Sequence, residues 1–467
     1  MNNFSNLNEQ ELRMLSSANP SERRMAVEDL MSKELDEEGV RILSRMLLDP
    51  DKGVRDSASL TLIFNGSPLI PKHVVPLISS GDIAIRNLAG EILLRIKDAS
   101  LSAMNEYLDG ANDDDQKFLI DIMGLIGSSK PVEKILQVLS SSSNDNVILS
   151  CIEALGNIQY SGAIPALIKI YETNELYKPT IAEALGKMNS KEALDFLLAK
   201  YHIEDDLTKF SIIESLGHLG EETTFYFLLS ELRKIKGPLV WPVIGSLYEL
   251  KEKFQLELPF DESIKHSVVY TLTDAEPRYK KAAASLITVF DDKDIMDTLI
   301  RVYGEDSEID ESIRPAFYKY SKLLYSKLPD IIRNYPSNLS SLLLLLRDIT
   351  EFENMETLNV LSELDKRNLS DAVALCLNNP GEEVRRTAIE LLFLMSLDYA
   401  LLFIDSMIED DNIWNRLKVL EMTENIFTPK INEILKKMIQ DPEEMIRERA
   451  GWILSQRGVT DLSTKTE

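Results

Sequence analysis

Apolar residues recur at every fourth position in a segment that begins with a polar residue and a proline. After Asn379-Pro380, the residues Val384, Ala388 and Leu392 fall on one stripe of a helix. An Asn side chain caps free amides and proline suits a first turn, so the pair predicts a helix start. Two more segments fill these positions, with an arginine after the first apolar residue: Asp49-Pro50, Val54, Arg55, Ala58, Leu62 and Asp441-Pro442, Ile446, Arg447, Ala450, Leu454. We call a helix with this pattern a signature helix.

The copies of this pattern are evenly spaced. Pro380 and Pro442 lie 62 residues apart, and 31 residues separate Pro50 from Gly81, which opens another copy. Weaker copies appear at the same step through most of the chain. A period of about 31 residues with two helical stretches per unit predicts stacked helical hairpins. We therefore expect an all-α fold, a right-handed α-solenoid (superhelix) of about 14 stacked hairpins.

This pattern resembles the HEAT repeats, and more closely the short HEAT-like variety of bilin lyases. The resemblance rests on Asp-Pro or Asn-Pro followed by Val-Arg-x-x-Ala or Ile-Arg-x-x-Ala at 49–58, 379–388 and 441–450, and on Ala-Leu-Gly at 154–156 and 184–186. It covers roughly residues 19 to 458. It implies the architecture and leaves function open, since HEAT arrays include scaffolds, transport adaptors, lyases and DNA glycosylases.

Two breaks in the rhythm divide the chain. Residues 1–18 form a polar lead with a helix near Glu9–Leu15, expected to cap a regular array over 19–234. An irregular middle follows over 235–379, then regular repeats over 380–458 and a tail over 459–467 that we expect to be disordered. Within the middle we predict a loop or short extended segment near 254–260 and a third helix within 355–377.

The composition is that of a folded soluble protein with an acidic excess. The chain holds 77 acidic and 51 basic residues, a formal net charge of −26. This charge opposes attraction to nucleic-acid phosphates and anionic lipid, so we expect neither as a partner. Residues 1–10 lack the features of a secretory signal, and the longest apolar run, 342–346, is too short to span a bilayer. We expect a cytoplasmic protein with no membrane segment.

The sequence offers no motif for catalysis or metal binding. Cys151 and Cys376 occupy apolar positions and are interpreted as core thiols. The histidines fall in different repeats without a second ligand at metal-binding spacing: His73, His202, His218 and His266. Glycine-rich nucleotide loops and the Gly-x-Ser-x-Gly motif are missing from the sequence. We predict no catalytic residue, no metal and no cofactor.

Two sets of repeat positions are interpreted as structural. The signature arginines are expected to reach the acidic turn of the adjacent repeat and form a ladder of charge-assisted hydrogen bonds: Arg55, Arg86, Arg385 and Arg447. As surface pairs, each would contribute under about 1 kcal/mol. Glycines after the signature helices are expected to end them in the left-handed conformation: Gly127, Gly156, Gly186 and Gly217.

Candidate partner-binding residues come from the middle of the chain. Thirteen of the fifteen tyrosines lie between Tyr160 and Tyr335, a region that also holds basic clusters. The HEAT resemblance places signature helices on the concave face, which puts Trp241, Lys280 and Tyr318 on neighbouring inner helices. Aromatic and cationic residues there could anchor an acidic or extended peptide. In the competing interpretation, Trp241 simply fills the core between two prolines.

Three hypotheses for function follow. The first is a non-catalytic scaffold or adaptor that binds a protein or peptide partner on its concave face. The second, implied only by the resemblance, is a bilin-lyase-like enzyme or chaperone. The third keeps the scaffold and places it in bacterial signalling, beside chemotaxis or two-component proteins. The oligomeric state stays open.

Overall fold

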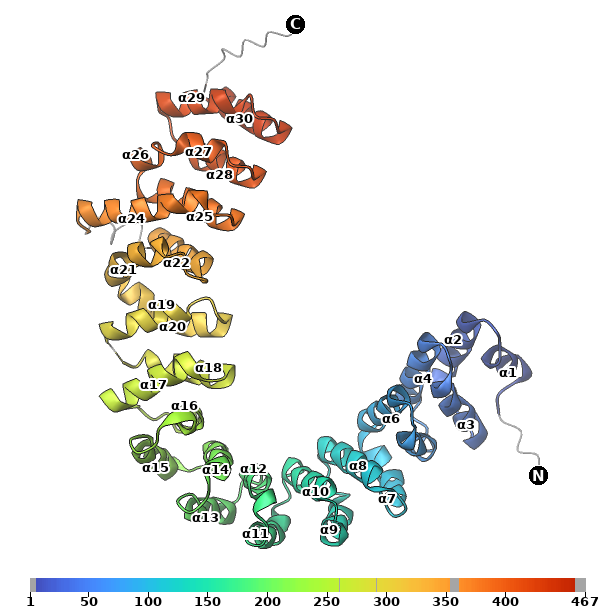
Figure 1. Cartoon of the computed structure of the whole chain (residues 1–467). Helices are drawn as coiled ribbons and strands as arrows, with labels where there is room; N and C mark the ends of the chain where they lie inside the picture. The colour runs from blue at the N-terminus through green and yellow to red at the C-terminus, as the bar shows by residue number, and fades with distance from the viewer. Residues whose placement is uncertain (1–5, 260, 291, 353–360, 458–467) are drawn as a thin grey trace. The chain divides into compact units, whose positions relative to one another are not determined.

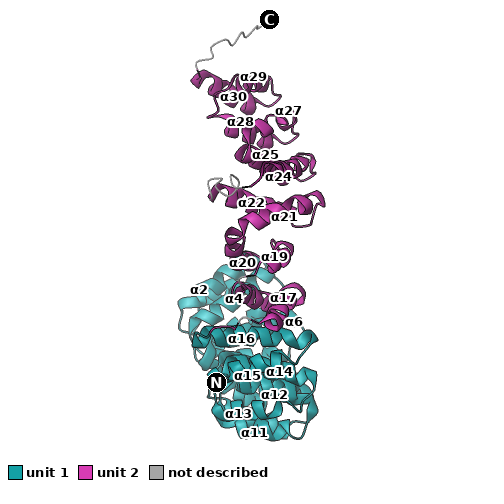
Figure 2. Ribbon diagram, turned by 90° about the vertical axis from the view of Figure 1, so that its left-hand side faces the viewer, with its two compact units in different colours: residues 1–256 teal, residues 257–467 magenta. Residues whose placement is uncertain are grey.

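The computed structural model describes residues 6–259, 261–290, 292–352 and 361–457. Over these residues the regular structure is helical and no strand is present, so the chain is the expected all-α solenoid of stacked helical hairpins (Figure 1). The helices form two compact units, unit 1 (residues 1–256) and unit 2 (residues 257–467), shown in Figure 2. The predicted divisions at 234 and 379 stay predictions.

Unit 1 alternates two kinds of helix. Its signature helices lie along the inner side of the unit's curve and the second helices along the outer side (Figure 1). The signature helices are α2 (Pro20–Asp29), α4 (Lys52–Asn65), α6 (Ile83–Arg95), α8 (Asp113–Ile126), α10 (Asp145–Asn157), α12 (Lys178–Lys187), α14 (Asp206–Leu219) and α16 (Val240–Phe254). The second helices are α3 (Glu37–Arg45), α5 (Ile70–Val74), α7 (Leu101–Leu108), α9 (Val132–Ser141), α11 (Ile164–Tyr171), α13 (Lys191–Lys200) and α15 (Glu222–Leu232). The expected N-terminal helix is α1 (Glu9–Leu15).

Unit 2 continues the alternation. Its signature helices are α18 (Pro277–Ile287), α20 (Ser307–Lys319), α22 (Leu339–Phe352), α25 (Glu382–Met395), α28 (Ile413–Thr423) and α30 (Glu444–Gln456). The other helices are α17 (Glu262–Asp274), α19 (Met296–Val302), α21 (Ser321–Arg333), α24 (Glu363–Leu375), α26 (Leu397–Ala400), α27 (Ile404–Ile408) and α29 (Pro429–Met438). The predicted third helix within 355–377 falls partly on residues 353–360, which lie outside the described residues; residues from 363 onward belong to α24.

The Pro pair of the repeat motif precedes the signature helix instead of starting it. Helix α25 begins at Glu382, two residues after Pro380, and α4 and α30 begin two residues after their prolines. The Asn379 side-chain oxygen accepts the backbone N–H of Gly381 at 2.9 Å. In the same way, Asp49 accepts the backbone N–H of Asp51 and Asp441 accepts that of Glu443, each at 2.9 Å. The pair therefore makes a local turn. In α4 a later residue, Asp51, caps the helix by accepting the N–H of Val54, whereas among the described residues no side chain caps α25 or α30.

Small residues let successive signature helices approach closely. Of the four glycines expected to end helices, only Gly127 does so, with φ +73° at the end of α8. The other three lie inside α10, α12 and α14, where a Cβ on Gly156 would sit 2.8 Å from the Ala184 Cα. Gly186 faces Ser215 and Gly217 faces Ser246 in the same way. The prediction was wrong there because these glycines serve close packing, which needs a missing Cβ and no special φ.

Serine hydroxyl groups complete this seam. Ser215 Oγ donates to the carbonyl of Ala182 at 2.9 Å, and Ser246 Oγ donates to the carbonyl of Ile213 at 2.8 Å. Each bond joins one signature helix to the previous one and satisfies a buried hydroxyl. The signature alanines Ala58, Ala388 and Ala450 are fully buried, as the register predicts.

A matched pair of glycines tests the seam. We expect Gly156→Ala to lower the free energy of unfolding by about 1–3 kcal/mol, because the new Cβ meets the backbone of α12. Gly451→Ala, inside α30 with no described atom within 4 Å of its Cβ position, should raise it by about 0.5–1 kcal/mol through helix propensity. Urea denaturation of both variants measures this. Equal shifts of the urea midpoint would contradict the seam.

Candidate functional site

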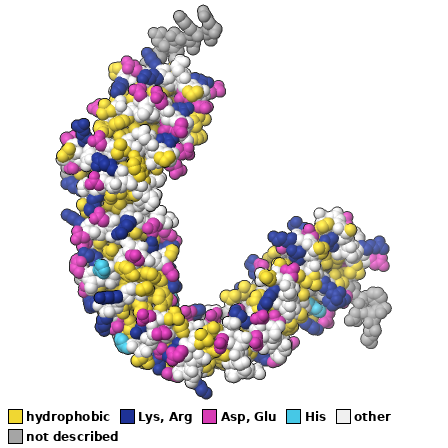
Figure 3. Space-filling model, viewed as in Figure 1, with side chains coloured by type: hydrophobic (Ala, Val, Ile, Leu, Met, Phe, Trp, Pro, Cys, Tyr) yellow, Lys and Arg dark blue, Asp and Glu magenta, His cyan; other side chains and the backbone are white. Residues whose placement is uncertain are grey.

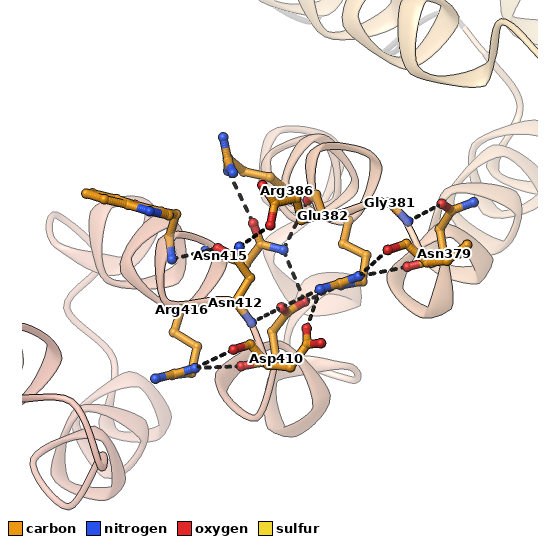
Figure 4. A network of polar contacts seen from close by, with 12 residues as sticks. Asn379, Gly381, Glu382, Arg386, Asp410, Asn412, Asn415 and Arg416 are labelled. Atoms are coloured by element: carbon orange, nitrogen blue, oxygen red, sulfur yellow. Dashed lines mark hydrogen bonds and ion pairs between the residues drawn. The ribbon is translucent and has the colours of Figure 1, made fainter.

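Arginine side chains tie consecutive repeats together at the turns before the signature helices. In α25, Arg385 Nη1 donates to the carbonyls of Asn379 and Pro380, at 2.9 and 3.2 Å, in the turn before its own helix. Its Nε and Nη2 donate to the two carboxylate oxygens of Asp410, at 2.7 and 3.0 Å, in the turn before α28 (Figure 4). One guanidinium thus spans two repeats with a bidentate fork.

The same geometry occurs twice more. Arg416 donates from Nη1 to the carbonyl of Asp410 at 2.7 Å and holds Asp441 with its fork at 2.8 and 3.0 Å. In unit 1, Arg23 donates to the carbonyl of Ser17 at 2.8 Å and holds Asp49 at 2.7 Å. The guanidinium of Arg23 lowers the pKa of the Asp49 carboxyl below its usual value.

The predicted arginine ladder is therefore confirmed in part. Arg385 reaches the adjacent turn, and Arg86 donates to the carbonyl of Asp114 at 3.1 Å. For Arg55 the prediction was wrong, since among the described residues it bonds only to the carbonyls of its own turn. Arg447 bonds to its own turn, and because the residues from 458 onward lie outside the described ones, its prediction stays a prediction. Arg23 was missed in the sequence because the Asn19-Pro20 pair at the start of its helix lies two residues closer to the arginine than in the other copies.

The pairs were expected at the surface, whereas the forked pairs of Arg385 with Asp410 and Arg416 with Asp441 are largely buried. The Arg416 and Asp441 side chains are 8% and 5% exposed, so they are buried and not surface groups. Losing one member of a buried pair leaves the other charge without its partner, which costs about 3–5 kcal/mol. The ladder therefore contributes to the rigidity of the array.

Two aspartates give a matched test of this burial. We expect Asp441→Ala to destabilise the protein by about 3–5 kcal/mol, because the buried Arg416 fork loses its carboxylate. Asp411→Ala should cost under about 1 kcal/mol, since its side chain is 87% exposed although it also contacts Arg385. Differential scanning calorimetry of both variants measures the difference. A loss of stability under about 1 kcal/mol for Asp441→Ala would mean that the fork does not stabilise the protein.

The two cysteine thiols lie in the protein core. Cys151 and Cys376 are buried, and burial raises the pKa of their thiols to about 12 and about 11. Within the described ranges, no three His, Cys, Asp or Glu side chains gather in a way that could hold a metal ion. His218 Nδ1 lies 3.0 Å from Glu249 Oε2, and this hydrogen bond raises the pKa of the histidine.

The three predicted partner-binding residues, Trp241, Lys280 and Tyr318, lie on different helices and in both units. Trp241 is half-buried in α16 of unit 1. In unit 2, Lys280 of α18 donates to Glu305 Oε2 at 2.7 Å, and Tyr318 of α20 packs edge to face on Phe352, with ring centroids 5.1 Å apart. Because Trp241 belongs to one unit and the other two to the second, their grouping into one site stays a prediction.

Basic residues of the middle region are paired with carboxylates. The charge of Lys280 meets Glu305, and four further pairs follow in unit 2: Lys281 with Glu308 at 2.7 Å, Lys327 with Asp297 at 2.7 Å, Arg333 with Asp330 at 3.1 Å and Arg314 with Asp348 at 3.9 Å. These cations are balanced within the protein and are not a basic surface by themselves.

Charges also alternate across the signature helices of unit 2. Arg347 of α22 lies 2.8 Å from Asp348 and 3.2 Å from Glu390 of α25, and Lys418 of α28 lies 3.1 Å from Glu390. Lys418 also reaches Glu421 at 2.7 Å. Each carboxylate on this line has a cation beside it, so the line is close to neutral.

The corresponding line in unit 1 is acidic. One carboxylate occurs on each of five consecutive signature helices, α6 to α14, two residues before a buried Leu or Met of the repeat: Glu91, Asp121, Glu153, Glu183 and Glu214. All five are exposed or half-exposed, while the residues on either side of each are largely buried. We call this line the acidic ridge. Figure 3 shows acidic side chains among basic ones along the visible face.

The acidic ridge is only partly neutralised. Lys117 lies 2.7 Å from Asp121, and Arg95 lies 3.8 Å from Glu91. Glu183 accepts a hydrogen bond from Ser211 at 3.3 Å. Glu153 has no ion pair among the described residues. Desolvation raises its pKa first, Asp121 and Glu183 raise it further, and the charges of Lys117 and Lys187 offset part of this rise. Repulsion between neighbouring helices is therefore still present at the centre of the ridge.

Exposed apolar side chains continue this line toward the N-terminus. Leu60 takes the ridge position in α4 and is 51% exposed, and Phe64, one turn further along α4, is 67% exposed. Leu125 occupies the corresponding later turn of α8 and is 65% exposed. The sequence reading missed the ridge because it treated acidic residues as caps of turns; aligning the copies on the repeat Leu would have revealed it.

No protein-family model and no curated protein matches the chain. Within the described ranges, no helix has both the length and the apolar character that crossing a membrane requires.

Solved structures resemble the chain at low identity. Kap95p, which induces the switch loops of RanGDP to adopt the GTP-bound conformation, shares 13% identity at a TM-score of 0.47, over 96% of this chain and 72% of Kap95p. Karyopherin Kap121p, bound to the extreme C-terminus of the phosphatase Cdc14p, shares 12% at 0.42, over 96% and 60%. An engineered protein shares 15% at 0.23, over 96% and 98%. These similarities assign the chain to no family.

Proposed function

We propose that this protein is a non-catalytic solenoid scaffold that binds another protein, and that the partner presents a basic segment to the acidic ridge of unit 1. The observation that carries the proposal is the row of five carboxylates at one register of α6 to α14. A single exposed acid is a common solvated residue, whereas one per repeat builds a continuous row of carboxylates, which Lys117 and Arg95 neutralise only in part.

The contrast with unit 2 supports the choice of surface. There the same line of signature helices is neutralised by its own cations, with Glu390 between Arg347 and Lys418. In unit 1, Glu153 lies between two other carboxylates that raise its pKa. A cation from a partner would relieve that repulsion, so charge complementarity favours a basic ligand over the acidic peptide expected from the sequence.

The spacing of the helices suggests the form of the ligand. Packed helices lie about 8–10 Å apart, and a polyproline II segment advances about 3.1 Å per residue with about three residues per turn, so every third side chain faces the same way. A lysine or arginine at every third residue would therefore meet a carboxylate on each successive helix. Leu60, Phe64 and Leu125 offer apolar contacts to the same segment.

The predicted residues Trp241, Lys280 and Tyr318 fit this proposal unequally. Trp241 lies on α16, next in the series after α14, at the register one turn before the ridge position. It extends the proposed surface with an aromatic side chain. Lys280 is bonded to Glu305, so its charge is engaged within the protein.

A charge-neutralising pair tests the proposal. A fluorescein-labelled 15-residue peptide with lysine at every third position is titrated with the protein at low salt, and fluorescence anisotropy gives the affinity. Glu153→Gln with Glu183→Gln should weaken binding about 2–5-fold for each charge removed, the effect of losing an exposed ion pair. Melting temperature should hold or rise, because the changes relieve repulsion at the ridge.

The control removes the same charge elsewhere. Asp330→Asn with Glu363→Gln takes two negative charges from side chains that are 86% and 90% exposed in unit 2. This variant should bind the peptide as the wild type does. An equal loss in both double variants would show general attraction to an acidic protein and would remove the ridge as the site.

A further inference from the structure

Arg447 of α30 repeats half of the geometry that joins the repeats. Its Nη1 donates to the carbonyls of Asp441 and Pro442, both at 2.7 Å, in the turn before its own helix. Arg385 and Arg416 make the same bonds to their own turns. The Arg447 guanidinium is therefore held by its turn as the other two are.

The other half of the geometry is missing for Arg447. In Arg385 and Arg416, Nε and Nη2 hold both oxygens of an aspartate from the next turn, Asp410 and Asp441 respectively. Among the described residues, no carboxylate forms an ion pair with Arg447. Arg447 as a whole residue is half-buried on α30.

The helix face beside this fork is open. Gly451 aligns with Ile389 of α25 and Leu420 of α28, which are fully buried where the following signature helix packs. No described atom lies within 4 Å of the position of a Cβ on Gly451. Met445 and Trp452, on the same helix, are 47% and 46% exposed. The face that α25 and α28 bury is thus uncovered on α30 in the described structure.

We propose that this face of α30 binds a helix of another protein that is preceded by an aspartate-bearing turn. The aspartate carboxylate accepts from Nε and Nη2 of Arg447, and the helix packs over Gly451. We infer this occupant from the two neighbouring interfaces, α25 with α28 and α28 with α30. In each of them an arginine fork holds the aspartate of the turn before the next helix. Charge complementarity between guanidinium and carboxylate supplies the specificity.

The fork argues against a second copy of this chain stacked on α30 through its α2 end. Arg23 donates from Nη1 to the carbonyl of Ser17, as Arg416 does to Asp410 and Arg447 does to Asp441. Ser17 therefore occupies the turn position that an aspartate fills in the other two repeats. A serine hydroxyl offers no bidentate carboxylate to Arg447. A partner with an acidic turn therefore fits the fork better.

A peptide from the chain itself provides the probe. The segment Gln440 to Arg457 contains the aspartate turn and α30, the element that α28 receives, so a labelled synthetic copy mimics the proposed occupant. We expect saturable binding to the full-length protein in fluorescence anisotropy. An Asp441→Asn peptide and an Arg447→Ala protein should each bind at least about tenfold more weakly, since a charged hydrogen-bond pair is lost.

Two further variants separate binding from folding. Gly451→Phe places a ring in open space, so the protein should keep its melting temperature and lose peptide binding. Arg55→Ala removes an arginine that makes the same bonds to its own turn in unit 1, and binding should stay unchanged.

Several results would overturn the proposal. One is the absence of binding at about 1 mM peptide, a concentration that would detect even a millimolar affinity. Another is binding that survives Arg447→Ala or Gly451→Phe. Self-association that depends on Arg447, seen by sedimentation, would make a second copy the occupant. Much tighter peptide binding by a chain that ends at residue 457 would make the chain's own last residues the occupant. Neither result bears on the acidic ridge.

Discussion

The close approach of successive signature helices is the constraint on which the rest of the structure depends. Gly156, Gly186 and Gly217 leave out the Cβ that would strike the next helix, and serine hydroxyls bond across the same seam. At the helix starts, arginine forks such as that of Arg416 hold consecutive turns at a fixed offset. Shape at one end of the helix and charge at the other thus set one register for each repeat.

That register decides which residues face solvent. Once the repeat Leu of each signature helix is buried, the residue two positions earlier must point outward, and in unit 1 this position is acidic on five consecutive helices. In unit 2 the corresponding line carries Arg347 and Lys418 beside Glu390 and is balanced internally. The same scaffold therefore presents two surfaces of different electrostatic character, which is the physical basis of the proposed docking site.

Periodicity made the architecture predictable, because an apolar residue at every fourth position and a step near 31 leave few alternatives to stacked hairpins. Burial of Ala58, Ala388 and Ala450 followed from the same register. The role of Gly156 was mistaken because a glycine near a helix end serves either a left-handed cap or close packing, and only the neighbouring helix decides between them. The pairing of Lys280 with Glu305 joins two repeats, and no local pattern reveals it.

Direct mapping of contacts tests the central claim that a basic segment lies along the acidic ridge. The lysine-bearing peptide is coupled to the protein with a zero-length reagent that joins amines to carboxylates, and mass spectrometry locates the products. The account predicts products at Glu91, Asp121, Glu153, Glu183 and Glu214, with successive lysines of the peptide coupled to successive carboxylates of the ridge. Products spread in similar yield over exposed carboxylates elsewhere, such as Glu175, Asp330 and Asp411, would contradict it.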